Sequence, residues 1–160
     1  MVARKNDRIL LLLTRYLWVE CEAPDKDQPD GWKDLMSETA GRLSIEHATR
    51  PLYLILAIGL KWMIFGWDPL QAGQNQQLSI NNDEGTSAWL IDPRICRVPN
   101  IQIPGRSYVD GNGVINTRLA KTLDCFTPVD QTAQGQQERR YMEDLNFLET
   151  CFVAIMNGVY

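Results

Sequence analysis

The residues that could support acid–base or nucleophilic chemistry are few and are scattered along the chain. There is one histidine, His47, and a nucleophilic site would have to combine it with Ser44 or with a cysteine. No Gly-x-Ser-x-Gly run marks a nucleophile, and a lone histidine is more typical of a helix surface or an interface. A fold could bring together Asp92, Asp110 and Asp124, but their spacing does not indicate a carboxylate pair. The sequence therefore predicts no catalytic residues and a protein that is not an enzyme.

Motifs for metals and cofactors are also missing. A zinc site needs closely spaced Cys and His ligands, whereas the cysteines are far apart: Cys21, Cys96, Cys125 and Cys151. Residues 110–113, DGNG, resemble the start of a calcium loop. An EF-hand loop would need Gly where Ile115 stands and Glu where Lys121 stands, so a hairpin turn is the better interpretation. We expect no metal and no cofactor.

The charge distribution is more informative. Segment 20–38 has seven acidic residues against two lysines, a net charge of −5, and segment 94–121 has five basic residues against Asp110, a net charge of +4. Most of the positive charges are arginines, which suit bidentate contact with phosphate. We predict a strip that contacts a nucleic-acid backbone without reading bases. Its residues are Arg4, Lys5, Arg8, Arg15, Arg94, Arg97, Arg106, Arg118, Lys121, Arg139 and Arg140. The alternative is that these side chains pair with the acidic segment or face solvent.

The element that would organise these residues is the most apolar stretch, residues 51–67 (PLYLILAIGLKWMIFGW), where Lys61 is the one charge. The run is shorter than the roughly 20 residues of a membrane span, and its Leu, Met and Ala content disfavours a strand. Pro51 suits a first helical turn, and Gly66 suits a helix end. We predict a buried central helix over about 51–66; docking of this helix into a partner protein and membrane contact are the alternatives.

Three further helices are predicted from apolar residues at spacings of three and four. The first covers 6–22, the second covers about 31–47 and the third covers 134–157. The second has the stripe Trp32, Leu35, Met36, Thr39 and Leu43. The fold class predicted from the sequence is therefore mainly α, a helical bundle in a single domain over residues 1–160.

Two segments depart from this helical pattern. Residues 67–87 are rich in Gln, Asn, Gly and Ser and are predicted to form a polar loop. Residues 88–116 are predicted to form an insert of short strands, because Pro93, Pro99 and Pro104 interrupt them. Within this insert we predict a β-hairpin in which 108–109 pair with 114–115 across the turn.

Composition is that of an ordinary water-soluble chain. Hydrophobic residues make up 44% and charged residues 22% of 160 residues, and the net charge is −4. The widely spaced cysteines favour reduced thiols, and no signal peptide is recognisable. We expect a cytoplasmic protein that does not act at membranes.

The layout resembles a known family. Residues 1–8 lead directly into the apolar segment 9–22, and a long helix over 134–157 closes the chain. This arrangement resembles the small subunit of CRISPR effector complexes, particularly of type I-D, which is similar to the C-terminal part of the large subunit. The resemblance implies an antiviral-defence protein that binds copies of itself and larger subunits. It also implies backbone contacts with the guide–target duplex and the displaced strand, whether DNA or RNA.

Together these observations predict a non-catalytic accessory subunit of a nucleoprotein complex. It would bind nucleic-acid backbone through arginines and larger protein subunits, or copies of itself, through apolar helix faces. The alternatives are a protein–protein interaction module without nucleic acid, and an enzyme of unrecognised type.

Overall fold

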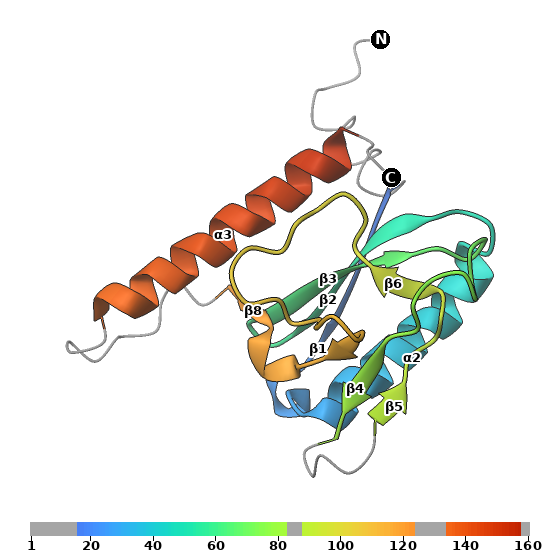
Figure 1. Cartoon of the computed structure of the whole chain (residues 1–160), viewed down its shortest axis with the longest axis horizontal. Coiled ribbons are helices and arrows are strands. Elements are labelled where there is room, and N and C mark those ends of the chain that lie inside the picture. Colours follow the sequence, from blue (N-terminus) through green and yellow to red (C-terminus); the bar gives the residue numbers. More distant parts are fainter. Residues whose placement is uncertain (1–15, 83–87, 124–133, 158–160) are drawn as a thin grey trace.

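A computed structural model describes residues 16–82, 88–123 and 134–157. Its centre is a mixed five-stranded sheet with the path β1-β2-β3-β6, in which β8 also pairs with β3. Strand β1 (Leu17–Glu22) runs parallel to β2 (Leu52–Ile58) and is joined to it by the 3-10 turn η1 (Pro24–Lys26) and helix α2 (Pro29–Glu46). Strand β3 (Lys61–Trp67) pairs antiparallel with β2. Figure 1 shows α2 running along the sheet.

The apolar run 51–67 is a β-hairpin, so the predicted central helix over 51–66 is wrong. Strands β2 and β3 have seven residues each and are joined through Gly59, whose φ is 58°. A Cβ built at Gly59 would lie 3.0 Å from Pro24, so both the turn and its neighbour favour glycine here. Two buried strands, joined by a turn that contains no charged residue, produced one uninterrupted apolar run.

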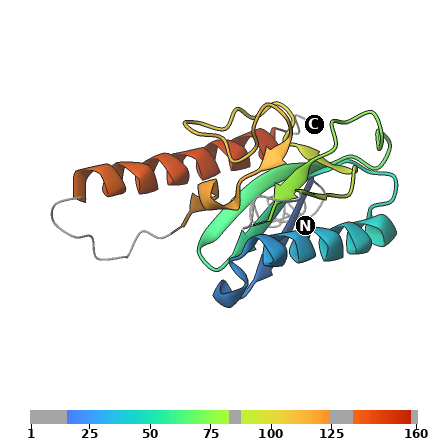
Figure 2. The same ribbon diagram turned by 60° about the horizontal axis from the view of Figure 1, so that its bottom comes forward.

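The central strands are apolar throughout because both faces of the sheet are covered. Even-numbered residues of β2 face the core that includes α2, whereas Tyr53, Ile55 and Ala57 face α3 (Gln134–Met156). From α3, Phe147, Cys151 and Ile155 are buried in this second core. Figure 2 shows the resulting layers, with the two helices on opposite faces of the sheet.

The remaining strands are short. A second sheet has the order β5-β4-β7, formed by Ala88–Leu90, Ser79–Asn81 and Val114–Ile115. On the far side of β3 from β2, β6 (Ile95–Arg97) pairs with residues 65–67, and β8 (Lys121–Thr122) pairs with residues 61–62. The predicted polar loop 67–87 therefore contains β4. The predicted hairpin is confirmed, because Val109 bridges Ile115 and Asp110 N–H donates to Val114 O at 3.0 Å.

Two of the other helix predictions are confirmed and one is partly wrong. The prediction over 31–47 is confirmed by α2, where the predicted stripe, from Trp32 to Leu43, is buried. The prediction over 134–157 is confirmed by α3. The helix over 6–22 is wrong for its second part, because residues 17–22 form β1; residues 6–15 lie outside the described part of the chain. Residues 117–119 form the 3-10 turn η2 (Thr117–Leu119).

The fold is therefore α/β, and the predicted mainly α helical bundle is wrong. The described residues contain two α-helices, eight strands and the two 3-10 turns. Within those residues, neither helix is both long enough and apolar enough to cross a membrane.

Candidate functional site

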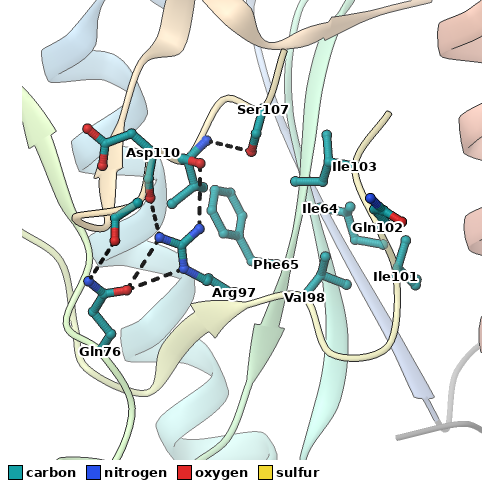
Figure 3. Close-up of a pocket in the computed structure, with 12 residues that line it drawn as sticks. Ile64, Phe65, Gln76, Arg97, Val98, Ile101, Gln102, Ile103, Ser107 and Asp110 are labelled. Carbon is teal, nitrogen blue, oxygen red and sulfur yellow. Dashed lines mark hydrogen bonds between the residues drawn. The ribbon is translucent and has the colours of Figure 1, made fainter. Parts of the chain in front are cut away.

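An opening beside the central sheet lies where the chain leaves β6. A cavity of about 480 Å³ is enclosed by the end of β3, by β6, by segment 101–103 and by the turn at 107–111. Figure 3 shows Arg97 and Gln76 on one side of this cavity and the Ile101–Ile103 segment on the other. Its walls are mixed: apolar side chains such as Ile64, Val98 and Ile103 alternate with polar groups from Gln76, Gln102 and Ser107.

Arg97 is held in place by neutral acceptors. Its Nε and Nη2 donate to Gln76 Oε1 at 3.4 and 3.3 Å, and its Nη1 donates to Val109 O at 3.5 Å. Nη2 also donates to Asp110 O. Among the described residues no carboxylate forms an ion pair with Arg97, whose side chain is exposed. The guanidinium is therefore oriented, but its charge is not neutralised.

The turn that supplies two of these acceptors is stabilised from within. Asp110 Oδ1 accepts from Asn112 N at 2.8 Å and from Val114 N at 2.9 Å. Gly113 closes the turn with a φ of 82°, a conformation that a side chain would disfavour. The Asp110 carboxylate is thus used in its own turn, and its main-chain carbonyl is presented to Arg97.

The opposite wall has unpaired backbone. Ile101 and Ile103 are half-buried and Gln102 is exposed, the alternation of an extended chain. Within the described structure, the main-chain groups of 101–103 make no hydrogen bond. Asn100, with a φ of 57°, sets the bend that turns the chain away from β6. Apolar contacts of Ile101 and Ile103 with the core beneath α3 hold the segment in place.

A second cavity, of about 500 Å³, has Arg97 and Gln76 in common with the first. Its other walls include Pro51, Asp68 and Cys96. Arg97 therefore borders two openings, and among the residues that line either cavity in the described structure it is the only lysine or arginine.

Two of the predicted basic residues are committed to intramolecular contacts. Arg94 forms an ion pair with Asp92, with 2.7 Å between Nη2 and Oδ2, and lies over the Trp67 ring at 4.8 Å. The hydrogen bond from the Arg94 side chain lowers the pKa of Asp92. Lys121 is buried, donates from Nζ to Pro104 O at 3.1 Å, and lies 3.6 Å from Asp144 Oδ1.

The other predicted basic residues lie elsewhere. The side chains of Arg106 and Arg118 are exposed. Four predicted residues, Arg4, Lys5, Arg8 and Arg15, lie outside the described residues, as do the side chains of Arg139 and Arg140. Of the predicted residues in the described part, only Arg97 lines either of these two cavities. Sequence reasoning missed Gln76 and segment 101–103; the one available signal was the position of Pro99 and Pro104 on either side of the segment.

The residues considered for chemistry are separated and locally bonded. His47 ends α2 and packs edge-on against Trp18 at 5.7 Å, whereas the Ser44 hydroxyl donates to Gly41 O at 2.7 Å. Asp92 is paired with Arg94, and Asp124 lies outside the described residues. In the part of the chain that is described, no group of three or more His, Cys, Asp or Glu residues is placed to hold a metal ion.

The chain matches no protein-family model, no curated protein and no solved structure. The geometry around Arg97 is therefore the basis for assigning a function.

Proposed function

We propose that this protein is a non-catalytic binding protein whose cavity beside Arg97 receives the anionic group of a ligand with an apolar body. The observation that supports this proposal is the environment of Arg97, an oriented guanidinium that no carboxylate of the described residues neutralises. Structural arginines normally have their charge compensated, as Arg94 does by Asp92. An arginine held only by neutral acceptors keeps its charge for an incoming anion.

The hydrogen-bond count supports the same proposal. A guanidinium has five N–H donors, and four bonds are made here. The single bond from Nη1 leaves a second N–H on that nitrogen for a ligand. A hydrogen bond to a charged partner contributes about 1.5–3 kcal/mol, more than a bond between neutral groups. Because the four neutral bonds already fix the side chain, little further ordering is needed on binding.

The cavity walls define the rest of the ligand. Volumes of roughly 300–1,000 Å³ are typical of ligand sites, and the cavity of about 480 Å³ lies in this range. The apolar side chains Ile64, Val98 and Ile103 face the same space as Arg97. We therefore expect inorganic anions to bind more weakly than anions with an apolar portion.

The test is a titration followed by the backbone amide signals in NMR spectra. The probes are inorganic phosphate, hexanoate, AMP and N-acetyl-leucyl-glutamate. We expect at least one probe with an apolar body to shift the amides of 97–103 and 107–111. Arg97→Gln should abolish these shifts, and Arg106→Gln, which removes an exposed charge from the same loop, should leave them unchanged. Shifts that survive in Arg97→Gln would contradict the proposal.

Binding of nucleic-acid backbone, including the role of a CRISPR small subunit, is the second candidate. The exposed side chains of Arg97 and Arg106 favour it. A strip of phosphate contacts would be weakened by both substitutions and would lose affinity steeply with added salt. Titration of labelled single- and double-stranded oligonucleotides at two salt concentrations separates this candidate from a cleft that depends on Arg97 alone.

A further inference from the structure

We infer that the ligand is an extended peptide segment that carries a carboxylate, and that its backbone pairs with residues 101–103 while its acidic group contacts Arg97. This inference rests on the proposed function and names its ligand class. It adds a second point of recognition on the cavity wall opposite Arg97: the main chain of 101–103, which has no hydrogen-bond partner among the described residues.

Segment 101–103 forms that wall. Segment 101–103 has the alternating burial of a strand, yet within the described residues its main chain has no hydrogen-bond partner. An unpaired extended segment is a template for one more strand, and peptide recognition by strand addition uses such edges. Side chains of Ile101 and Ile103 anchor the segment in the core, so it need not become ordered when a peptide arrives.

Two openings border the Arg97 side chain. Arg97 and Gln76 line both cavities, one bordered by 101–103 and the other by Pro51 and Asp68. A compact ligand would fill one of these spaces. A chain molecule can pass the Arg97 side chain and occupy both.

The basic charge at the two cavities suits a carboxylate better than a phosphodiester strand. Arg97 is the only lysine or arginine among the described residues that line the two cavities. The N–H left on Nη1 suits one oxygen of a carboxylate. A phosphodiester strand presents a charge at every nucleotide and needs a series of cations, which these walls do not supply.

The experiment selects ligands and then tests the backbone contact. A random octapeptide library with free C-termini is selected on the immobilised full chain, and Arg97→Gln is kept for the binding measurements. Urea unfolding first establishes that this variant folds as the parent does. The best peptide is then measured by calorimetry in three forms: unchanged, with its acidic group converted to an amide, and with each backbone nitrogen methylated in turn.

We expect the amide form, and separately Arg97→Gln, to lose about tenfold or more in affinity, because a charge-assisted hydrogen bond is removed. We expect methylation at alternate positions to lose about fivefold each, the pattern of strand pairing. Arg106→Gln should bind the unchanged peptide as the parent does.

The outcomes separate the inference from the proposed function. Dependence on Arg97 and on the acidic group with no effect of methylation would overturn the peptide inference and leave the proposed function standing. Failure to enrich any peptide, with oligonucleotides bound in an Arg97-dependent way, would overturn it in favour of the second candidate. Binding of the selected peptide that is insensitive to Arg97→Gln would overturn both.

Discussion

The β2–β3 hairpin and the segment that follows β6 both contain apolar residues. They differ in how their main-chain groups are hydrogen-bonded. Residues 52–58 are buried, and β3 is paired along both edges, with β2 on one side and with β6 and β8 on the other. Between β6 and β8, the Tyr108 hydroxyl donates to Ile64 O at 2.7 Å and accepts from Ile64 N at 2.9 Å. In segment 101–103, within the described structure, no such partner exists.

The two arginines near β6 show the same contrast in charge. Arg94 is neutralised by Asp92 and stacked on Trp67. Arg97 borders a cavity and donates its hydrogen bonds to neutral acceptors. The β2–β3 hairpin, whose main chain is hydrogen-bonded, holds the sheet together. Segment 101–103 and Arg97 have hydrogen-bonding groups left for a ligand. Substitutions in the first region should therefore change stability, and substitutions in the second should change binding.

The largest effect is expected from Leu56→Asp in β2. Leu56 is 0% exposed, and an unpaired carboxylate buried there should lower the free energy of unfolding by several kcal/mol, a large part of a typical total of about 5–15 kcal/mol. Ile45→Asp is the matched control, because Ile45 in α2 is 83% exposed. Circular dichroism during urea unfolding should show an unfolded or strongly weakened Leu56→Asp protein beside a near-normal control. A cooperative transition at the parent midpoint would mean that this face of the sheet is open.

The hairpin also shows why the sequence pointed to a helix. A strand covered on one face alternates apolar and polar residues, but a strand covered on both faces does not. Residues 52–58 face two cores in turn, so their pattern carries no period of two. The signal that separates the two strands is Gly59, which forms the turn between them. Helix α2, with one buried face and one exposed face, kept its period and was predicted correctly.

A smaller loss is expected from Tyr108→Phe. The substitution keeps the buried ring but leaves Ile64 N–H and C=O without the hydroxyl that bonds both. An unsatisfied buried group costs about 1–3 kcal/mol, so the urea midpoint should fall with an unchanged slope. Thr150→Ala, which removes the hydroxyl that donates to Asn146 O on an exposed helix surface, should change the midpoint little. An equal shift in both variants would show that the hydroxyl does not close the gap in the sheet edge.

The Asp92–Arg94 pair should make stability depend on pH. The hydrogen bond from the Arg94 side chain lowers the pKa of Asp92 below the ordinary 3.8. The Asp92 carboxylate therefore binds a proton less tightly in the folded protein than in the unfolded chain. The stabilisation is therefore complete above about pH 5 and is lost as the pH falls through the folded pKa. Asp92→Asn should lower the free energy of unfolding by about 1 kcal/mol at pH 7 and by less at pH 3. A difference between variant and parent that does not shrink on acidification would show that the carboxylate charge does not matter.

The candidate site was predictable only in part. Arg97 was among eleven basic residues selected by charge alone, as was Arg94, three residues earlier. The difference comes from residues distant in sequence: Gln76, and the carbonyls of Val109 and Asp110, surround Arg97. The neutralising residue of Arg94, in contrast, is two positions away, and the spacing Asp92-x-Arg94 could have indicated it. Contacts between residues distant in sequence therefore determine which arginine keeps a charge that no carboxylate of the described residues neutralises.

The smallest effect concerns the rates at which the cysteines near the hairpin and near the cavities react with iodoacetamide. Burial raises the pKa of Cys151 to about 12, so this thiol stays protonated at pH 8. Cys21 in β1 is exposed, and Cys96 is half-buried on the wall of the second cavity. We expect iodoacetamide at pH 8 to label Cys21 first, Cys96 more slowly and Cys151 only after unfolding, as followed by peptide mass spectrometry. A ligand that occupies both cavities should slow Cys96 and leave Cys21 unchanged, whereas slowing of both would indicate general stabilisation instead of occupation of the cavity.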